Sequence, residues 1–146
     1  LLFSNREGKE VWLSVLKGAA MEIREGWLLA RVRLAGKRFG VFEDALIDTG
    51  APFTVIPPAI SDFLELETSR AFPKAMLVTA SGLIEAPIKI LEKLEISDME
   101  IEKLPVVVHK IPDPAPIKVL LGMNFIEKVK LIINGKGRKF DLKDPP

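Results

Sequence analysis

The residues of this chain that are best suited to chemistry lie in the run 45–51, Ala-Leu-Ile-Asp-Thr-Gly-Ala. Three apolar residues come directly before Asp48, so we predict that a buried strand ends at this carboxylate. Gly50 has no side chain and lets the backbone and a ligand come close. An Asp-Thr-Gly sequence also suits an ordinary Asx turn, in which the aspartate side chain accepts a hydrogen bond from the nearby backbone. The run therefore indicates either a carboxylate presented for acid–base chemistry or a structural turn.

A second apolar motif lies downstream at 119–124, with the sequence Val-Leu-Leu-Gly-Met-Asn. With both motifs, the chain resembles the retropepsin-like aspartic proteases, the single-lobe relatives of pepsin that include the retroviral proteases. The resemblance spans roughly residues 31–142, the core of a predicted single domain, 1–146. It implies that Asp48 is the catalytic acid and that three neighbours support its loop: Thr49, Gly50 and Ala51. It also implies a short helix from near Asn124 and, before it, a ψ-shaped crossing beneath the loop by Leu120, Leu121 and Gly122.

The number of candidate acids predicts an assembly. The chain contains one Asp-Thr-Gly and no Asp-Ser-Gly. Aspartic peptidase chemistry needs two carboxylates that share a proton, because two negative charges ~3 Å apart cannot both persist. The second Asp48 must therefore come from another copy of the chain, related by a two-fold axis. The resemblance implies that Thr49 bonds the opposite loop across this axis. Met123 stands where the retroviral enzymes carry an arginine that ties their dimer together, which is a departure from the family pattern.

Between the two motifs, residues 78–84 (Val-Thr-Ala-Ser-Gly-Leu-Ile) resemble the flap hairpin that such enzymes fold over the substrate. The predicted substrate-binding positions are at its tip: Thr79, Ala80, Ser81 and Gly82. An ordinary hairpin turn can have the same sequence pattern and is the alternative interpretation. Retroviral flaps carry more glycine than this segment, which predicts a stiffer hairpin here.

The elements that must position these residues are short, β-branched-rich runs broken by glycine, proline and asparagine, a pattern typical of a mainly β domain. We expect a closed, retropepsin-like β-barrel with one or two short helices and a flap hairpin. Pro87 cannot donate a hydrogen bond to a central ladder, so we expect it at a sheet edge or a bend. The sequence predicts a helix over 59–66, after a proline pair, and strands over 11–16, 27–34, 39–48, 54–56, 75–79, 84–96, 104–109, 131–133 and 139–142.

Composition argues against several classes of function. Lys and Arg number 21 against 20 Asp and Glu, so a net charge of +1 provides no strong field for nucleic acid or an anionic membrane. Cysteine is absent, which rules out disulfides and thiolate metal sites, and His109 is the only histidine. No apolar run approaches the ~20 residues of a membrane span. We therefore expect no metal, no other cofactor, no nucleic-acid partner and no membrane partner within this chain.

The amino-acid usage also indicates the growth temperature of the source and the compartment of the protein. Glutamine and cysteine are both absent, while Glu, Lys, Ile, Leu and Val are abundant, a bias that is typical of hyperthermophile proteins. A chain without cysteine is compatible with a reducing compartment, and we expect a cytoplasmic location. The chain starts at Leu1 rather than at a methionine, so we also expect that a leader, an anchor or another domain could precede it.

From these features we predict a homodimeric aspartic endopeptidase, in which a water activated by the two Asp48 carboxyls hydrolyses peptide bonds. The substrate is a polypeptide, which would lie extended between the flap and the floor of the site and pair by strand addition. The alternative is a catalytically inactive retropepsin-like module that dimerises or binds peptides, which Met123 and the glycine-poor flap favour.

Overall fold

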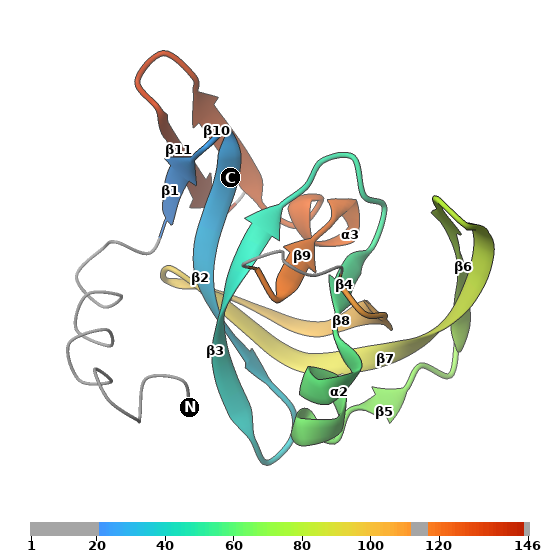
Figure 1. Ribbon diagram of the computed structural model, residues 1–146. Coiled ribbons are helices and arrows are strands. Elements are labelled where there is room, and N and C mark those ends of the chain that lie inside the picture. Colours follow the sequence, from blue (N-terminus) through green and yellow to red (C-terminus); the bar gives the residue numbers. More distant parts are fainter. Residues whose placement is uncertain (1–20, 112–116, 145–146) are drawn as a thin grey trace, which may run out of the picture.

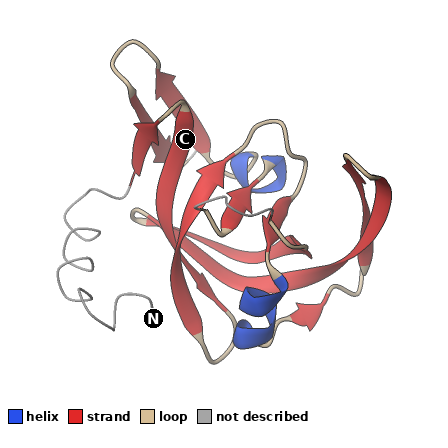
Figure 2. Ribbon diagram, in the orientation of Figure 1, coloured by secondary structure: helices blue, strands red, loops and turns tan. Residues whose placement is uncertain are grey.

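The computed structural model describes residues 21–111 and 117–144. Most of this part of the chain is strand, which confirms the prediction of a mainly β protein (Figure 1, Figure 2). The predicted strand over 11–16 lies outside the described residues. The strands are β1 (Met21–Arg24), β2 (Trp27–Ala35), β3 (Gly40–Ile47), β4 (Thr54–Ile56), β5 (Glu67–Thr68), β6 (Lys74–Thr79), β7 (Gly82–Ile96), β8 (Met99–Val108), β9 (Val119–Leu121), β10 (Lys130–Asn134) and β11 (Lys139–Lys143).

Two short helices complete the described part of the chain, α2 (Pro58–Leu64) and α3 (Met123–Ile126). Pro58 occupies the first turn of α2, as predicted, because a proline there has no intrahelical hydrogen bond to lose. Glu65 then ends α2 with a left-handed backbone, φ 55°. None of the helices in this part of the chain is long and apolar enough to cross a membrane.

The main sheet returns on itself. Its strands follow the order β1-β2-β3-β9-β4-β8-β7-β5, and β2 also pairs with β7, so the strands form a ring (Figure 1). The β3–β9 and β4–β8 pairs are parallel, whereas the other pairs of this sheet are antiparallel. β6 pairs with β7 outside the ring, and β10 and β11 form a separate two-stranded sheet. The finer prediction of a closed barrel stays a prediction.

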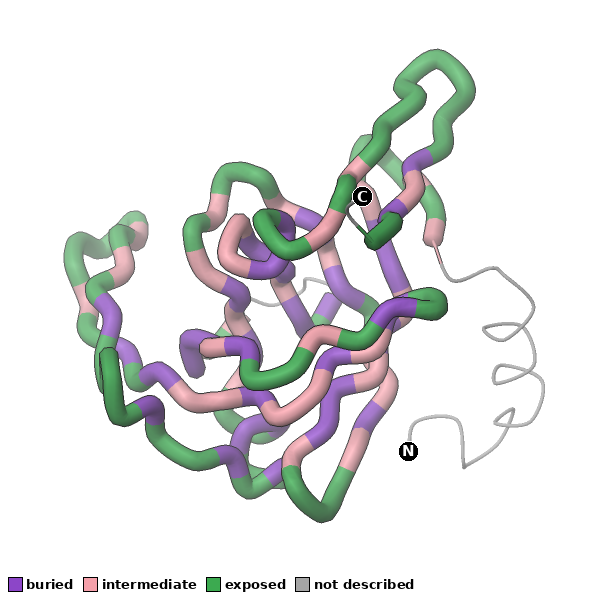
Figure 3. The backbone as a smooth tube through the Cα atoms, turned by 180° about the vertical axis from the view of Figure 1, so that it is seen from behind, coloured by how far each residue is buried: buried purple, intermediate pink, exposed green. Residues whose placement is uncertain are grey.

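The core fills the inside of this ring. Alternate residues of the ring strands are buried, such as Val32 and Leu34 on β2 and Leu104 and Val106 on β8. Phe125 of α3 is fully buried, and α3 contacts β4, β8 and β9. Figure 3 shows buried residues along the ring strands and exposed residues at the turns and at the tips of the β6–β7 and β10–β11 hairpins. β9 and α3 are therefore held in place by apolar packing against the core of the ring.

The predicted strand over 104–109 is wrong at its start, because β8 begins at Met99 and pairs with β7 from the Ile96↔Met99 position onward. Residues 99–102 alternate apolar and charged side chains, and their strand is stabilised by pairing with β7 rather than by a continuous apolar run. β1 was not predicted at all. It carries only two apolar residues and depends on its pairing with β2.

Pro87 lies where the sequence predicts it, at a sheet edge. It pairs with Lys74 of β6, while the pairing of β7 with β8 begins one residue later, at Ile88↔Val107. Because proline has no N–H, this is the position of β7 at which a change of partner strand costs the fewest hydrogen bonds. The β6–β7 hairpin therefore projects from the ring at Pro87.

Candidate active site

A loop joins the end of β3 to β4 (Figure 1). Asp48 is the first residue of this loop, directly after Ile47. Its N–H donates to the carbonyl of Leu121 at 2.9 Å, which continues the parallel pairing of β3 with β9 by one residue. Its side-chain Oδ1 accepts from the N–H of Gly50 at 2.8 Å. Asp48 is half-buried, whereas Thr49 and Gly50 are exposed. The carboxylate is thus held at the surface by the core beneath it.

The bond from Gly50 to Asp48 is the Asx turn that the structural interpretation of Asp-Thr-Gly predicts. The turn uses one oxygen of the carboxylate and the backbone of the loop. It is compatible with chemistry, because a carboxylate that accepts a backbone N–H keeps further acceptor capacity.

β9 passes beneath the loop between β3 and β4. Leu120 lies opposite Leu46 of β3 in a parallel pair and opposite Val55 of β4 in an antiparallel pair. Leu121 is fully buried beside Ile47. The structure thus brings Leu120, Leu121 and Gly122 together with the Asp48 loop, as the ψ-shaped arrangement requires.

Gly122 makes the closest backbone approach at this crossing. A Cβ atom there would lie 2.3 Å from the carbonyl oxygen of Phe53 and 2.8 Å from that of Ala51. The next two backbone N–H groups hold the same loop: Met123 donates to the Ala51 carbonyl at 2.7 Å and Asn124 donates to the Pro52 carbonyl at 3.1 Å. The loop is consequently tied at both ends to the segment 121–124.

Two polar side chains at this crossing were not among the predicted site residues. Thr54 is fully buried at the start of β4, and its hydroxyl and N–H both donate to Oδ1 of Asn124, at 2.9 and 2.8 Å. Asn124 also donates from Nδ2 to the carbonyl of Pro105 at 2.8 Å. No local pattern in the sequence marks this pair, because the burial of Thr54 and its contact with Asn124, 70 residues away, arise only in the fold.

The β6–β7 hairpin stands beside the loop. The face with Ala75 and Ala86 packs against Phe53 of the Asp48 loop through a small apolar cluster, whose other members are Val55, Leu77, Ile88 and Val107. The opposite face leaves Val78 and Leu83 exposed. The hairpin is therefore attached to the loop at its base.

The hairpin tip has its own hydrogen bonds. The Thr79 hydroxyl donates to the Gly82 carbonyl at 2.9 Å and accepts from the N–H of Ser81 at 3.2 Å. Gly82 has φ +118°, which L side chains rarely adopt. Ala80 and Ser81 form the exposed turn. The structure thus places the four predicted flap residues together at the tip of the β6–β7 hairpin, which extends from the ring of strands.

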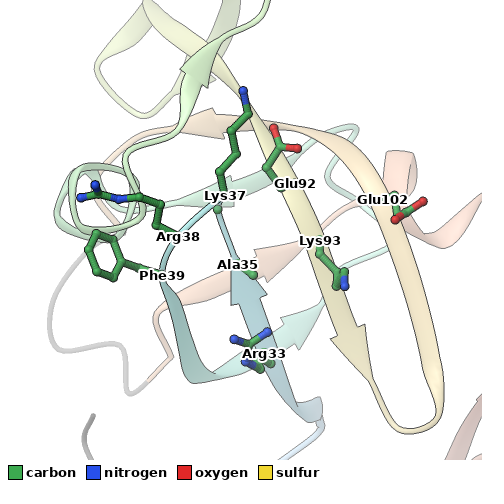
Figure 4. Close-up of a pocket in the computed structure, with 9 residues that line it drawn as sticks. Arg33, Ala35, Lys37, Arg38, Phe39, Glu92, Lys93 and Glu102 are labelled. Carbon is green, nitrogen blue, oxygen red and sulfur yellow. The ribbon is translucent and has the colours of Figure 1, made fainter.

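Two hollows of the described part of the chain lie outside the Asp48 loop. A hollow of about 280 Å³ opens near the β2–β3 turn, and Figure 4 shows its charged lining. Each basic side chain of this lining already contacts a carboxylate at 2.8–3.6 Å, in the pairs Arg33–Glu95, Lys37–Glu67, Arg38–Glu65 and Lys93–Glu100. The basic side chains that line this hollow are therefore engaged in surface ion pairs.

A second hollow, of about 490 Å³, lies between α2 and the residues before β9 and is lined by Glu43, Ile60 and Lys118 among others. Burial raises the pKa of the Glu43 carboxyl, although the nearby Arg31 guanidinium lowers it in part. No residue of the Asp48 loop lines either hollow. Within the described residues no group of three or more His, Asp or Glu could hold a metal ion.

The close approach at Gly122 yields a prediction. Gly122→Ala should lower the free energy of unfolding by about 1–3 kcal/mol, because the new methyl group overlaps backbone oxygens that cannot rotate away. Denaturant unfolding of the full chain measures this change. Gly135→Ala is the matched control, since a Cβ there meets no atom within 4 Å. Equal stabilities of the two variants would contradict the close packing of this crossing.

Comparisons with known proteins agree with this geometry. Residues 30–125, more than half of the chain, match the family model described as aspartyl protease. The chain is also similar to the crystal structure of a retropepsin-like aspartic protease from Rickettsia conorii, at a TM-score of 0.57 and 21% identity, over 80% of this chain and 83% of that one. This likeness shows the fold. No curated protein gives a significant match. The chain therefore belongs to the aspartyl protease family and has a retropepsin-like fold.

Proposed function

We propose that the protein is an aspartic endopeptidase that works as a homodimer, with Asp48 of each copy forming the catalytic pair. The observation that carries the proposal is the position of Asp48. Its backbone is anchored by Leu121 in the buried β9 strand, and its side chain stands in an exposed turn. A carboxylate with a rigid backbone and an accessible side chain suits acid–base chemistry, which depends on geometry first.

The need for a second copy follows from the chemistry. One ionised carboxylate takes a proton from the attacking water, while a protonated partner polarises the scissile carbonyl. The water oxygen bonds to the carbonyl carbon, and the peptide C–N bond breaks after the nitrogen accepts a proton. The chain has a single Asp-Thr-Gly, so the partner is the Asp48 of a second copy. Thr49 is exposed beside Asp48 and would contact the opposite loop.

The β6–β7 hairpin is proposed as the flap over the substrate, with Thr79, Ala80, Ser81 and Gly82 at its tip. Among the described strands, β6 pairs with β7 alone, so one edge of β6 remains open to an extended peptide. The apolar cluster at the base of the hairpin joins Leu77 to Phe53 of the Asp48 loop. We expect apolar substrate side chains to pack there. No cofactor takes part.

A second candidate function is a dimerising or peptide-binding module without turnover. The observation that favours it is Met123, the first residue of α3, which is partly buried against the main core. An apolar side chain at this position cannot make the ionic dimer contacts that the retroviral arginine makes. A peptide-binding module would keep the hairpin and lose hydrolysis.

The first test is Asp48→Asn. Asparagine still accepts the Gly50 hydrogen bond but cannot take up the proton, so hydrolysis of an unfolded protein substrate should fall by about 10³-fold or more. Light scattering should show the same dimer for the variant and the wild type. Asp98→Asn, in an exposed turn, is the control and should leave the rate unchanged. Near-wild-type hydrolysis by Asp48→Asn, or an active monomer, would contradict the proposal.

The second test is the dependence of hydrolysis on pH. The active pair holds one proton, so the rate should fall at low pH, where both carboxyls are protonated, and at high pH, where both are ionised. We expect a bell-shaped profile with its optimum on the acid side of neutral, unchanged by a chelator. A rate that rises steadily to alkaline pH, or that a chelator abolishes, would be incompatible with a pair of carboxyls.

A further inference from the structure

The side chains of Thr54 and Asn124 connect four segments at the base of the Asp48 loop. Thr54 begins β4, Asn124 belongs to α3, Pro105 lies on β8, and Gly122 follows β9. Thr54 is 0% exposed, and a polar group so deeply buried requires hydrogen-bond partners. Its N–H and its hydroxyl are both hydrogen-bonded, and each of these partners is at least 68 residues away in the sequence.

The hydrogen bonds of this cluster run in one direction. Asn124 donates from Nδ2 to the Pro105 carbonyl, which leaves its Oδ1 facing Thr54. Oδ1 accepts both the N–H and the hydroxyl proton of Thr54. Because the Thr54 hydroxyl proton is committed to Asn124, the hydroxyl oxygen is available as an acceptor, and the N–H of Gly122 donates to it at 3.2 Å. The cluster therefore fixes the direction of the Gly122 N–H.

This N–H belongs to the same peptide group as the carbonyl of Leu121, which accepts the Asp48 N–H at 2.9 Å. A peptide group is planar, so its C=O and N–H cannot rotate independently. If the Gly122 N–H turned away from Thr54, the Leu121 oxygen would move relative to Asp48. The orientation of the Asp48 backbone is thus coupled to the Thr54 hydroxyl through one rigid unit.

We propose that Thr54 and Asn124 are positioning residues for Asp48, acting through the Leu121–Gly122 peptide. The inference rests on the proposed function of Asp48. It adds two residues that never touch the substrate but determine where the carboxylate stands. In a homodimer the same linkage occurs twice, so a loss of the hydroxyl displaces both members of the catalytic pair. A misplacement of about 1 Å can lower a rate by ~10²-fold.

The test compares Thr54→Val, which removes the hydroxyl and keeps the shape of the side chain, with Thr54→Ser, which keeps the hydroxyl. For Thr54→Val we expect kcat to fall on the order of 10²-fold, while KM changes little, because substrate contacts are intact. Thr54→Ser keeps the hydroxyl, so its kcat should stay within a few fold of the wild type. Asn124→Asp is the second variant. It leaves Thr54 in place but removes the donor to Pro105, and kcat should fall in the same way.

Amide hydrogen exchange of the full chain provides a readout that does not require activity. In Thr54→Val the Asp48 amide should exchange faster than in the wild type and in Thr54→Ser, whereas the Leu34 amide in β2 should not change. General destabilisation would instead raise the exchange of both amides. Unchanged kcat with unchanged Asp48 exchange in Thr54→Val and Asn124→Asp would overturn the inference. Selective Asp48 exchange together with full activity of Asp48→Asn would contradict the proposed function and leave the coupling of Thr54 to the Asp48 backbone supported.

Discussion

The hydrogen bond from the Asp48 N–H to the Leu121 carbonyl is the interaction on which the rest of the site depends. It joins two motifs that are more than seventy residues apart, the end of β3 and the end of β9. Because β9 lies between β3 and β4 and pairs with both, the Leu121 carbonyl at its end is a rigid acceptor. A candidate acid on an exposed turn thereby acquires a backbone position that is determined by the core.

The ring of strands explains why this position is stable. β2 pairs with both β3 and β7, so the strand that leads into the Asp48 loop is connected to the far side of the sheet. Phe125 packs behind β9 as part of the main core. Gly122 has no side chain, which allows the Asp48 loop to approach the end of β9 closely. The fold thus concentrates its packing beneath the loop and leaves the β6–β7 hairpin as an extension with few buried side chains.

Local signals predicted much of this arrangement. The apolar run before Asp48, the proline pair at the start of α2 and the turn residues of the hairpins each specify their element within a few residues. Pro87 marks the position within β7 where the pairing with β6 ends and the pairing with β8 begins. The signals that failed were not local. Residues 21–24 of β1 and 99–102 of β8 do alternate apolar and charged side chains, but each alternation is only four residues long, and these segments are stabilised by pairing with β2 and β7.

The same distinction applies to the site. Asp48, Gly50 and Gly122 are recognisable because each belongs to a short sequence motif, although Asp48 and Gly122 make their contacts with segments far away in the sequence. Thr54 and Asn124 are an ordinary threonine and asparagine until the fold brings them together across 70 residues. Residues whose role is to orient another residue have no chemical signature of their own, so only the three-dimensional structure identifies them.

The central claim, that two copies share one catalytic pair, is tested most directly by mixing wild-type chains with Asp48→Asn chains under conditions in which subunits exchange. If each site needs an Asp48 from both copies, only wild-type pairs are active, and an equal mixture should retain about one quarter of the activity of the same total amount of wild type. The rate should follow the square of the wild-type fraction. A linear dependence, with about one half of the activity in the equal mixture, would show that each chain works alone and would contradict the account.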